Sequence, residues 1–116
     1  GPPRAPCAPT VHAYTAAMRA ASEGGRWQAA LDIWDDLRAS GCAPTAHAYA
    51  AAISACASGR AWQRAVSLFE EMTAGGITPD VVSCTALVSA LASGGETDKA
   101  EAVVQWMLRT GLTPNV

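Results

Sequence analysis

The stretch CAPTVHAYTAA at residues 7–17 recurs as CAPTAHAYAAA at residues 42–52, with two differences in eleven positions. The offset is 35 residues, and columns of proline, glycine and alanine follow the same period. These columns are Pro9, Pro44, Pro79 and Pro114; Gly24, Gly59 and Gly94; Gly41, Gly76 and Gly111; Ala20, Ala55 and Ala90; and Ala30, Ala65 and Ala100. Self-similarity at a fixed period of this length predicts an array of structural repeats.

The period divides the chain into three units, residues 11–45, 46–80 and 81–115, which we expect to form one solenoid domain. Residues 7–10 match the end of a preceding unit, and Val116 matches the start of a following one. The dipeptide Gly1-Pro2 is typical of the remnant of a cleaved expression tag. We therefore expect residues 1–10 to hold such a remnant and the tail of a preceding repeat, and the chain to be part of a longer array.

Each unit contains two segments whose apolar residues recur at helical spacing. The first helices are expected to bury Tyr14, Ala17, Met18 and Ala21; then Tyr49, Ala52, Ile53 and Cys56; then Cys84, Leu87, Val88 and Leu91. The second helices are expected to bury Trp27, Ala30, Leu31, Trp34 and Leu37; then Trp62, Ala65, Val66, Phe69 and Met72; then Ala100, Val103, Val104 and Met107. Gly24 is expected to end the first helix of the first unit as a left-handed residue, and Gly41 is expected to end the second helix.

A single helical hairpin cannot bury such a stripe alone, whereas stacked hairpins can. The sequence therefore predicts an all-α fold, an α-solenoid of about six helices whose concave face is lined by the first helix of each unit. Terminal repeats usually need polar caps. Because the stripe residues Tyr14, Cys84, Leu87 and Val103 face missing neighbours, we expect end-to-end self-association of the chain.

Composition excludes several classes of protein. Half of the 116 residues are hydrophobic, which is too many for a disordered tail. No apolar run approaches the roughly 18 residues of a membrane span, so no membrane partner is expected. The four cysteines form no C-x-x-C pair, and no catalytic Ser/His/Asp set, paired acids or phosphate-binding glycine loop is present. We expect no metal, no cofactor and no enzyme activity.

The units, for example AYTAAMRAASEGGRWQAALDIWDDLRASGCAPT at residues 13–45, resemble the pentatricopeptide repeat family. The period of 35, the glycine–apolar–x–proline ending and LFEEM at Leu68–Met72 carry the resemblance, which covers residues 7–116. It implies a right-handed superhelix that binds single-stranded RNA, one base per repeat. It also implies a role in RNA stabilisation, processing, editing or translation in an organelle, the chloroplast more readily than the mitochondrion. The related tetratricopeptide repeats have 34 residues and mostly bind peptides, so a peptide-binding scaffold is the alternative.

In the family, one column of the first helix and the last residue of the unit together select the base. The resemblance therefore pairs Thr15 with Thr45, Ala50 with Asp80, and Thr85 with Asn115. An ionised aspartate only accepts hydrogen bonds, which suits the ring N–H of uracil or guanine, whereas an asparagine amide suits adenine or cytosine. The expected order of bases is a purine, then uracil or guanine, then adenine.

The last-residue column has a second interpretation. Thr10, Thr45, Asp80 and Asn115 each precede an expected first helix, and all are favoured N-cap residues. Capping alone would explain their polarity, and one side chain can serve both roles.

The residues expected to flank a base are His12, His47, Val82 and Val116. The family usually has an aliphatic residue in this column, so the two histidines depart from it. Their rings either stack on bases or are solvated near a helix start. Arg19 is the only cation on the inner faces, where it could contact phosphate. Most acids fall in the second helices, so the sequence predicts a neutral to mildly basic groove with weak affinity for RNA.

Overall fold

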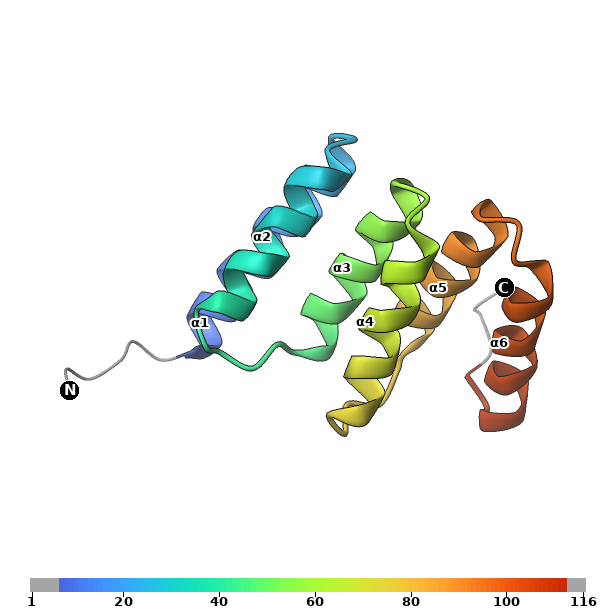
Figure 1. Cartoon of the computed structure of the whole chain (residues 1–116). Coiled ribbons are helices and arrows are strands. Elements are labelled where there is room, and N and C mark those ends of the chain that lie inside the picture. The colour runs from blue at the N-terminus through green and yellow to red at the C-terminus, as the bar shows by residue number, and fades with distance from the viewer. Residues whose placement is uncertain (1–6, 113–116) are drawn as a thin grey trace.

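The computed structural model describes residues 7–112, with side chains from Thr10 onward, and within this range the chain forms six α-helices and no strand (Figure 1). The helices are α1 (Cys7–Glu23), α2 (Trp27–Ala39), α3 (Ala46–Ser58), α4 (Trp62–Ala74), α5 (Val81–Ser93) and α6 (Thr97–Thr110). None of these helices combines the length and apolar character that a membrane span requires.

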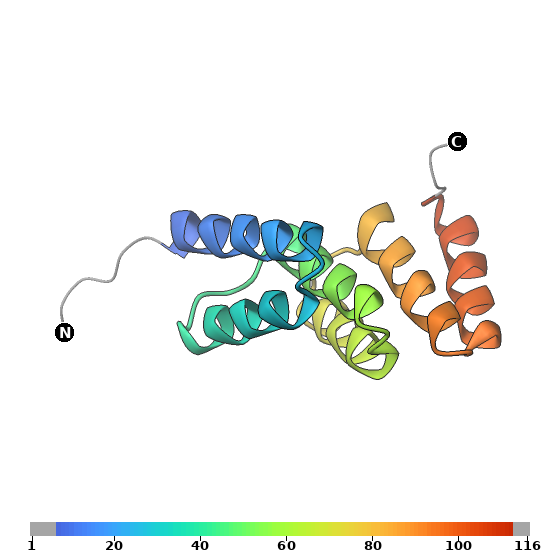
Figure 2. The same ribbon diagram turned by 90° about the horizontal axis from the view of Figure 1, so that it is seen from above.

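The helices form three hairpins, α1–α2, α3–α4 and α5–α6, which follow one another along the molecule (Figure 2). Each first helix packs against its own second helix and against the first helix of the next hairpin. The second helices α2 and α4 also contact the first helix that follows them. This arrangement is the α-solenoid that the period predicts.

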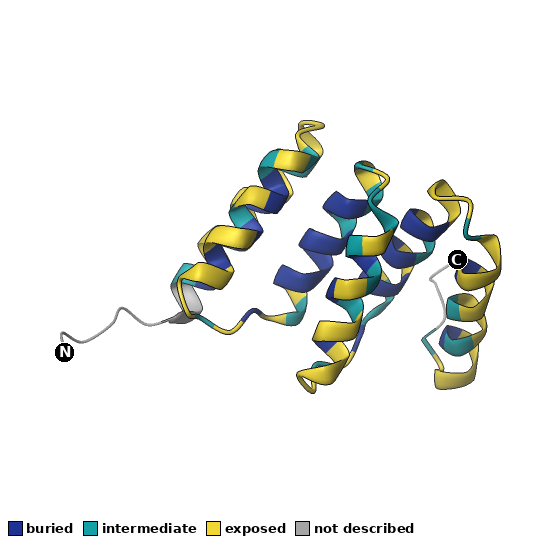
Figure 3. Cartoon of the chain, in the orientation of Figure 1, coloured by how far each residue is buried: buried dark blue, intermediate teal, exposed yellow. Residues whose placement is uncertain are grey.

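The central helix, α3, contributes the most residues to the core: eight of its thirteen residues are buried (Figure 3). Its alanines bring neighbouring helices close, because a methyl group adds little bulk and loses no rotamer freedom. Met18, Ile53 and Leu91 of the predicted stripe are fully or almost fully buried.

Two of the predicted core residues lie at the surface instead. Ala17 is exposed and Val104 is 36% exposed. The residues equivalent to them in other units, such as Ala52 and Trp34, are buried by an adjacent hairpin. Ala17 and Val104 face the outer ends of the stack, where the described chain supplies no such hairpin.

The prediction that Gly24 is the left-handed residue of the turn between α1 and α2 is wrong. The left-handed residue is the one after it, Gly25 with φ 77°, and Gly24 does not have a positive φ. The backbone N–H of Arg26 donates to the Ala21 carbonyl at 2.8 Å, which closes a Schellman-type turn around this pair. Gly41, which was predicted to end the second helix, is left-handed, with φ 83°. The second unit has Arg60 at the left-handed position, with φ 58°.

The Gly59 column serves to admit a tryptophan from the preceding repeat. A Cβ atom at Gly59 would lie 2.3 Å from the indole of Trp27, and one at Gly94 would lie 2.1 Å from the indole of Trp62. Contacts this short do not occur between real side chains, so the indole packs there only because glycine has no side chain. Trp27 of the first hairpin thus packs over Gly59 of the second, and Trp62 of the second packs over Gly94 of the third.

The start of α1 also differs from expectation. Thr10 lies inside α1, which begins at Cys7, and so it does not precede the helix as an N-cap. Pro9 falls in the first turn, where the missing N–H has no intrahelical partner in any case. In the later units, Thr45 and Asp80 do precede α3 and α5 and cap them.

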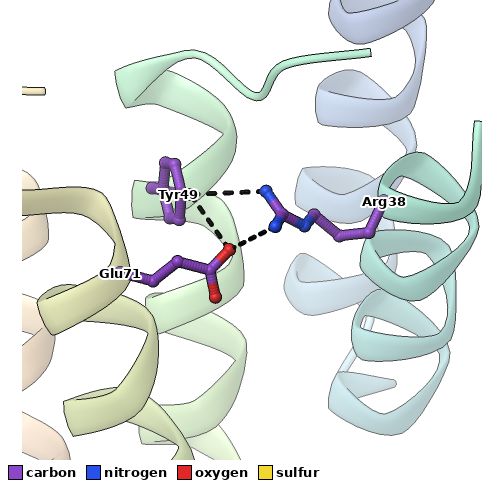
Figure 4. A network of polar contacts seen from close by, with 3 residues as sticks. All are labelled: Arg38, Tyr49 and Glu71. Atoms are coloured by element: carbon purple, nitrogen blue, oxygen red, sulfur yellow. Dashed lines mark hydrogen bonds and ion pairs between the residues drawn. The ribbon is translucent and has the colours of Figure 1, made fainter. Parts of the chain in front are cut away.

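A polar cluster joins the first two repeats (Figure 4). Arg38 of α2 lies 2.7 Å from the Glu71 carboxylate of α4, and the Tyr49 hydroxyl of α3 donates to the same carboxylate at 3.2 Å. The Tyr49 ring also packs on Trp34, with centroids 4.9 Å apart. Burial and the neighbouring Glu71 charge raise the pKa of Tyr49. Because Arg38 and Glu71 are each more than 40% exposed, their ion pair contributes only about 0–1 kcal/mol.

Candidate functional site

A cavity of about 440 Å³ opens where the first helices of the three hairpins meet. Its walls come from the end of α1, from α3, and from the start of α5 with the residue before it. The lining residues are Arg19, Ser22, Glu23, His47, Ala50, Ala51, Ser54, Asp80 and Val82. The small side chains of Ala50 and Ala51 keep its floor open. The structure thus brings together five residues that the sequence predicted for binding: Arg19, His47, Ala50, Asp80 and Val82.

Asp80 is held in a defined orientation at the start of α5. Its Oδ1 accepts a hydrogen bond from the backbone N–H of Ser83 at 2.8 Å. The Ser83 hydroxyl accepts in return from the Asp80 backbone N–H at 3.1 Å, which completes a capping box. A carboxylate has about four acceptor positions, so the cap leaves acceptor capacity for a ligand in the cavity. The capping role is therefore present, and it is compatible with a binding role.

Thr45 caps α3 in a similar way, because its Oγ1 accepts from the Ala48 backbone N–H at 3.2 Å. Its predicted partner Thr15 is only 7% exposed, and its hydroxyl donates to the Val11 carbonyl at 2.7 Å. The donor of Thr15 is thus already used inside its own helix. The Thr15–Thr45 pair therefore leaves less hydrogen-bonding capacity for a ligand than the Ala50–Asp80 pair does.

Thr85 is exposed and lines a second, shallower hollow of about 380 Å³ together with Val82. Val82 is 57% exposed and therefore forms an apolar ridge between the two hollows. Asn115 and Val116, which were predicted to complete this third site, lie outside the described residues.

The two histidines of the flanking column are not equivalent. His47 lines the main cavity, as Val82 does, whereas His12 is exposed and lies outside both hollows. Within the described residues, no group of three His, Cys, Asp or Glu side chains is placed to hold a metal ion.

The charge of the main cavity corrects the expectation of a mildly basic groove. Glu23 lines it together with Asp80, so two carboxylates accompany the single guanidinium of Arg19. The reason is helical geometry, because Glu23 lies four residues after Arg19 and so shares its face of α1. That spacing was visible in the sequence. Ser22, Ala51 and Ser54 are the other lining residues that were not among the predicted binding residues.

Ser22 adds an unsatisfied polar atom to the cavity wall. Its Oγ is buried and has no hydrogen-bond partner among the described residues. Buried hydroxyls usually find a partner, so a ligand that enters this end of the cavity could supply one.

The sequence matches two family models. The model described as "Pentatricopeptide repeat domain" matches residues 7–58 and 67–116, and the model described as "PPR repeat" matches residues 47–77. No curated protein gives a significant sequence match.

The solved structures give close matches. The pentatricopeptide repeat protein PPR10 in complex with an 18-nucleotide psaJ RNA element is 34% identical, with a TM-score of 0.81. A cysteine-to-serine variant of PPR10 with the same RNA element gives the same values, and PPR10 from maize gives a TM-score of 0.80 at 34% identity. The match covers 91% of this chain and 15–16% of those chains, so the chain spans about one sixth of their length.

Proposed function

Because the chain belongs to the pentatricopeptide repeat family, we propose that it binds single-stranded RNA along the face formed by α1, α3 and α5, one base per repeat. The observation that carries the proposal is the cavity that joins Ala50, Asp80, His47 and Val82. The similarity of the chain to PPR10, whose structure contains bound RNA, supports the same kind of ligand. We propose further that it acts within an organellar factor for RNA stabilisation, processing or translation, in the chloroplast rather than the mitochondrion.

The cavity is large enough to admit a base, and its lining suits one chemically. The Val82 side chain offers an apolar surface to one face of a base, and the His47 imidazole offers a planar ring to the other. Asp80 presents a carboxylate that only accepts hydrogen bonds. A base with a ring N–H, uracil or guanine, therefore fits the second repeat better than adenine or cytosine does.

This site should distinguish only weakly between the four bases. The Ala50 methyl supplies no hydrogen bond, so one carboxylate makes the whole distinction between bases. Arg19 is the one cation of the cavity and shares it with Glu23 and Asp80, so phosphate neutralisation is weak. Three bases at roughly 1–3 kcal/mol of stacking each, less the cost of ordering the RNA, give high-micromolar or weaker binding.

The test is a titration of the isotope-labelled chain with short single-stranded RNAs that differ only at the central base, followed by amide chemical shifts. Uracil or guanine at the centre should shift the Ala50 and Ala51 amides at lower RNA concentration than adenine or cytosine does. Asp80→Asn should reverse this order, because an amide also donates, while an asparagine keeps the N-cap.

Asp98→Asn is the matched control, since it removes the same charge from an exposed position on α6. It should leave the base preference unchanged. If millimolar RNA of any sequence leaves the amides in place, the chain does not bind RNA. If an extended peptide shifts the same amides and RNA does not, the groove is a peptide-binding site instead.

A further inference from the structure

The two hollows on the inner face are copies of one another. The main cavity and the hollow beside Thr85 have volumes of about 440 and 380 Å³. Six of the seven residues that line the second hollow lie 35 positions after a residue that lines the first, for example Val82 after His47 and Ser89 after Ser54. The same hollow therefore recurs from one repeat to the next.

Two residues, Ser54 and Val82, line both hollows. A ligand that places successive units in the two hollows passes from one to the other over these residues. Val82 is aliphatic and largely exposed, so it suits the apolar face of a base. Ser54 offers a hydroxyl, and in protein–nucleic acid complexes serine hydroxyls commonly bond to phosphate and sugar oxygens. Ser54 is thus the polar part of the divide between the hollows.

The Ser54 hydroxyl is available for such a contact. Ser54 is partly buried on α3 and makes no hydrogen bond within the part of the chain that the structure describes. It differs in this from Thr15, whose hydroxyl donates to the Val11 carbonyl of its own helix. Ser54 follows Ala50 by four residues and so lies on the same face of α3. Because Ala50 and Asp80 take the edge of the base, the opposite side of the nucleotide, which carries the sugar and phosphate, is left for Ser54.

On the premise of the proposed function, that the chain binds RNA, we propose that Ser54 is a positioning residue for the RNA backbone. Its hydroxyl donates to the sugar–phosphate linkage that joins the bases of the second and third repeats. The contact reads no base, and it matches the spacing of two successive nucleotides to that of the repeats.

The neighbouring repeats place polar side chains in the same column. Arg19 and Ser89 lie 35 residues before and after Ser54, and each lines one of the two hollows. This column therefore forms a backbone track beside the column that selects bases. Because two of its three members are neutral, the track positions RNA with little electrostatic attraction.

Substitutions of Ser54, with binding of the RNA AAUAA followed by amide chemical shifts, test the assignment. Ser54→Lys should tighten binding by about two- to fivefold at low salt, because an ammonium replaces the hydroxyl beside the phosphate. It should also steepen the slope of log K against log salt concentration by about 0.7, the value for one more neutralised phosphate on a single strand. Ser54→Ala should weaken binding by about two- to tenfold. Both variants should keep the preference for a central uracil over a central adenine.

The same two substitutions at Ser67 are the controls. Ser67 is exposed on α4, in the same hairpin, and lines neither hollow. Neither the affinity nor the salt dependence should change in these controls.

A single uncharged linkage in the RNA locates the contact. The uracil of AAUAA sets the register opposite Asp80, so the linkages on its two sides lead to the bases of the first and third repeats. A methylphosphonate in place of one of these linkages removes one charge. On one side of the uracil it should cancel the gain from Ser54→Lys, and on the other side it should leave most of that gain. If both replacements cancel the gain, or neither does, the proposal is overturned.

The remaining outcomes separate this proposal from the proposed function. Circular dichroism verifies folding, and Ser54→Ala removes one atom from an alanine-rich helix, so it provides a test even where the lysine variant does not fold. Ser54 variants that behave like the Ser67 controls overturn the proposal, as does an effect that depends on the central base. In both cases the native chain still binds RNA, so the proposed function stands. A native chain that binds no RNA overturns both.

Discussion

The alanine substitution Gly59→Ala tests how the repeats interlock. The added Cβ would lie 2.3, 2.4 and 2.7 Å from three carbons of the Trp27 indole. A rigid bicyclic ring cannot bend away, so the indole must rotate or the second hairpin must shift. Overpacking of this kind costs about 1–3 kcal/mol.

The backbone at Gly59 does not add to this cost. Its φ of −90° and ψ of 4° are accessible to alanine. Replacing glycine there would by itself stabilise the chain by about 0.4–1 kcal/mol, through the lower entropy of the unfolded state. The net expectation is a loss of about 1–2 kcal/mol, which corresponds to a fall in Tm of about 4–10 °C.

Thermal and urea unfolding followed by circular dichroism at 222 nm provide the measurement. Gly24→Ala is the matched control, since its Cβ would meet only the Ala20 and Ala21 carbonyls at 3.6 Å. It should leave Tm unchanged or raise it slightly. Trp27→Thr gives the first unit the residue that the third unit has at the same position, Thr97. In this background, Gly59→Ala should no longer destabilise the protein. Equal effects of Gly59→Ala and Gly24→Ala in the native background would refute the interlocking.

Substitutions at three further positions test local features of the fold. Arg60→Gly should be more stable than Arg60→Ala by about 1 kcal/mol in urea unfolding, because both variants lose the hydrogen bond to the Ser93 carbonyl and only glycine relieves the left-handed φ of 58°. Burial raises the pKa of Cys56 from 9.0 to about 11, so its contribution is complete below pH 9 and is lost as pH rises through 11. Urea unfolding at several pH values should show an alkaline loss of about 2–3 kcal/mol from this thiol, which Cys56→Ala should abolish. Asp80→Ala should cost about 1 kcal/mol by removing the α5 cap, whereas Asp80→Asn should be nearly neutral.

The sequence by itself determined the class of fold and its period. Helical spacing of apolar residues, glycine after each second helix and the 35-residue repeat are local or periodic signals, and they specify six helices in three hairpins. They also placed Met18, Ile53 and Leu91 in the core, because residues on one helix face share one environment. The resemblance to the family and the first-helix faces supplied the five predicted binding residues that line one cavity, and the stacking of α1, α3 and α5 brings them together.

The tertiary structure decided which residues are covered by a neighbouring repeat. Gly59 is required by an indole 32 residues earlier, a relation that no helix-capping rule contains. The buried Thr15 and the exposed Thr85 occupy the same column, and they differ only because α3 covers one and no described helix covers the other. Such properties depend on how one hairpin stacks on the next, and that stacking is set by contacts between residues far apart in the chain rather than by the pattern within any one repeat.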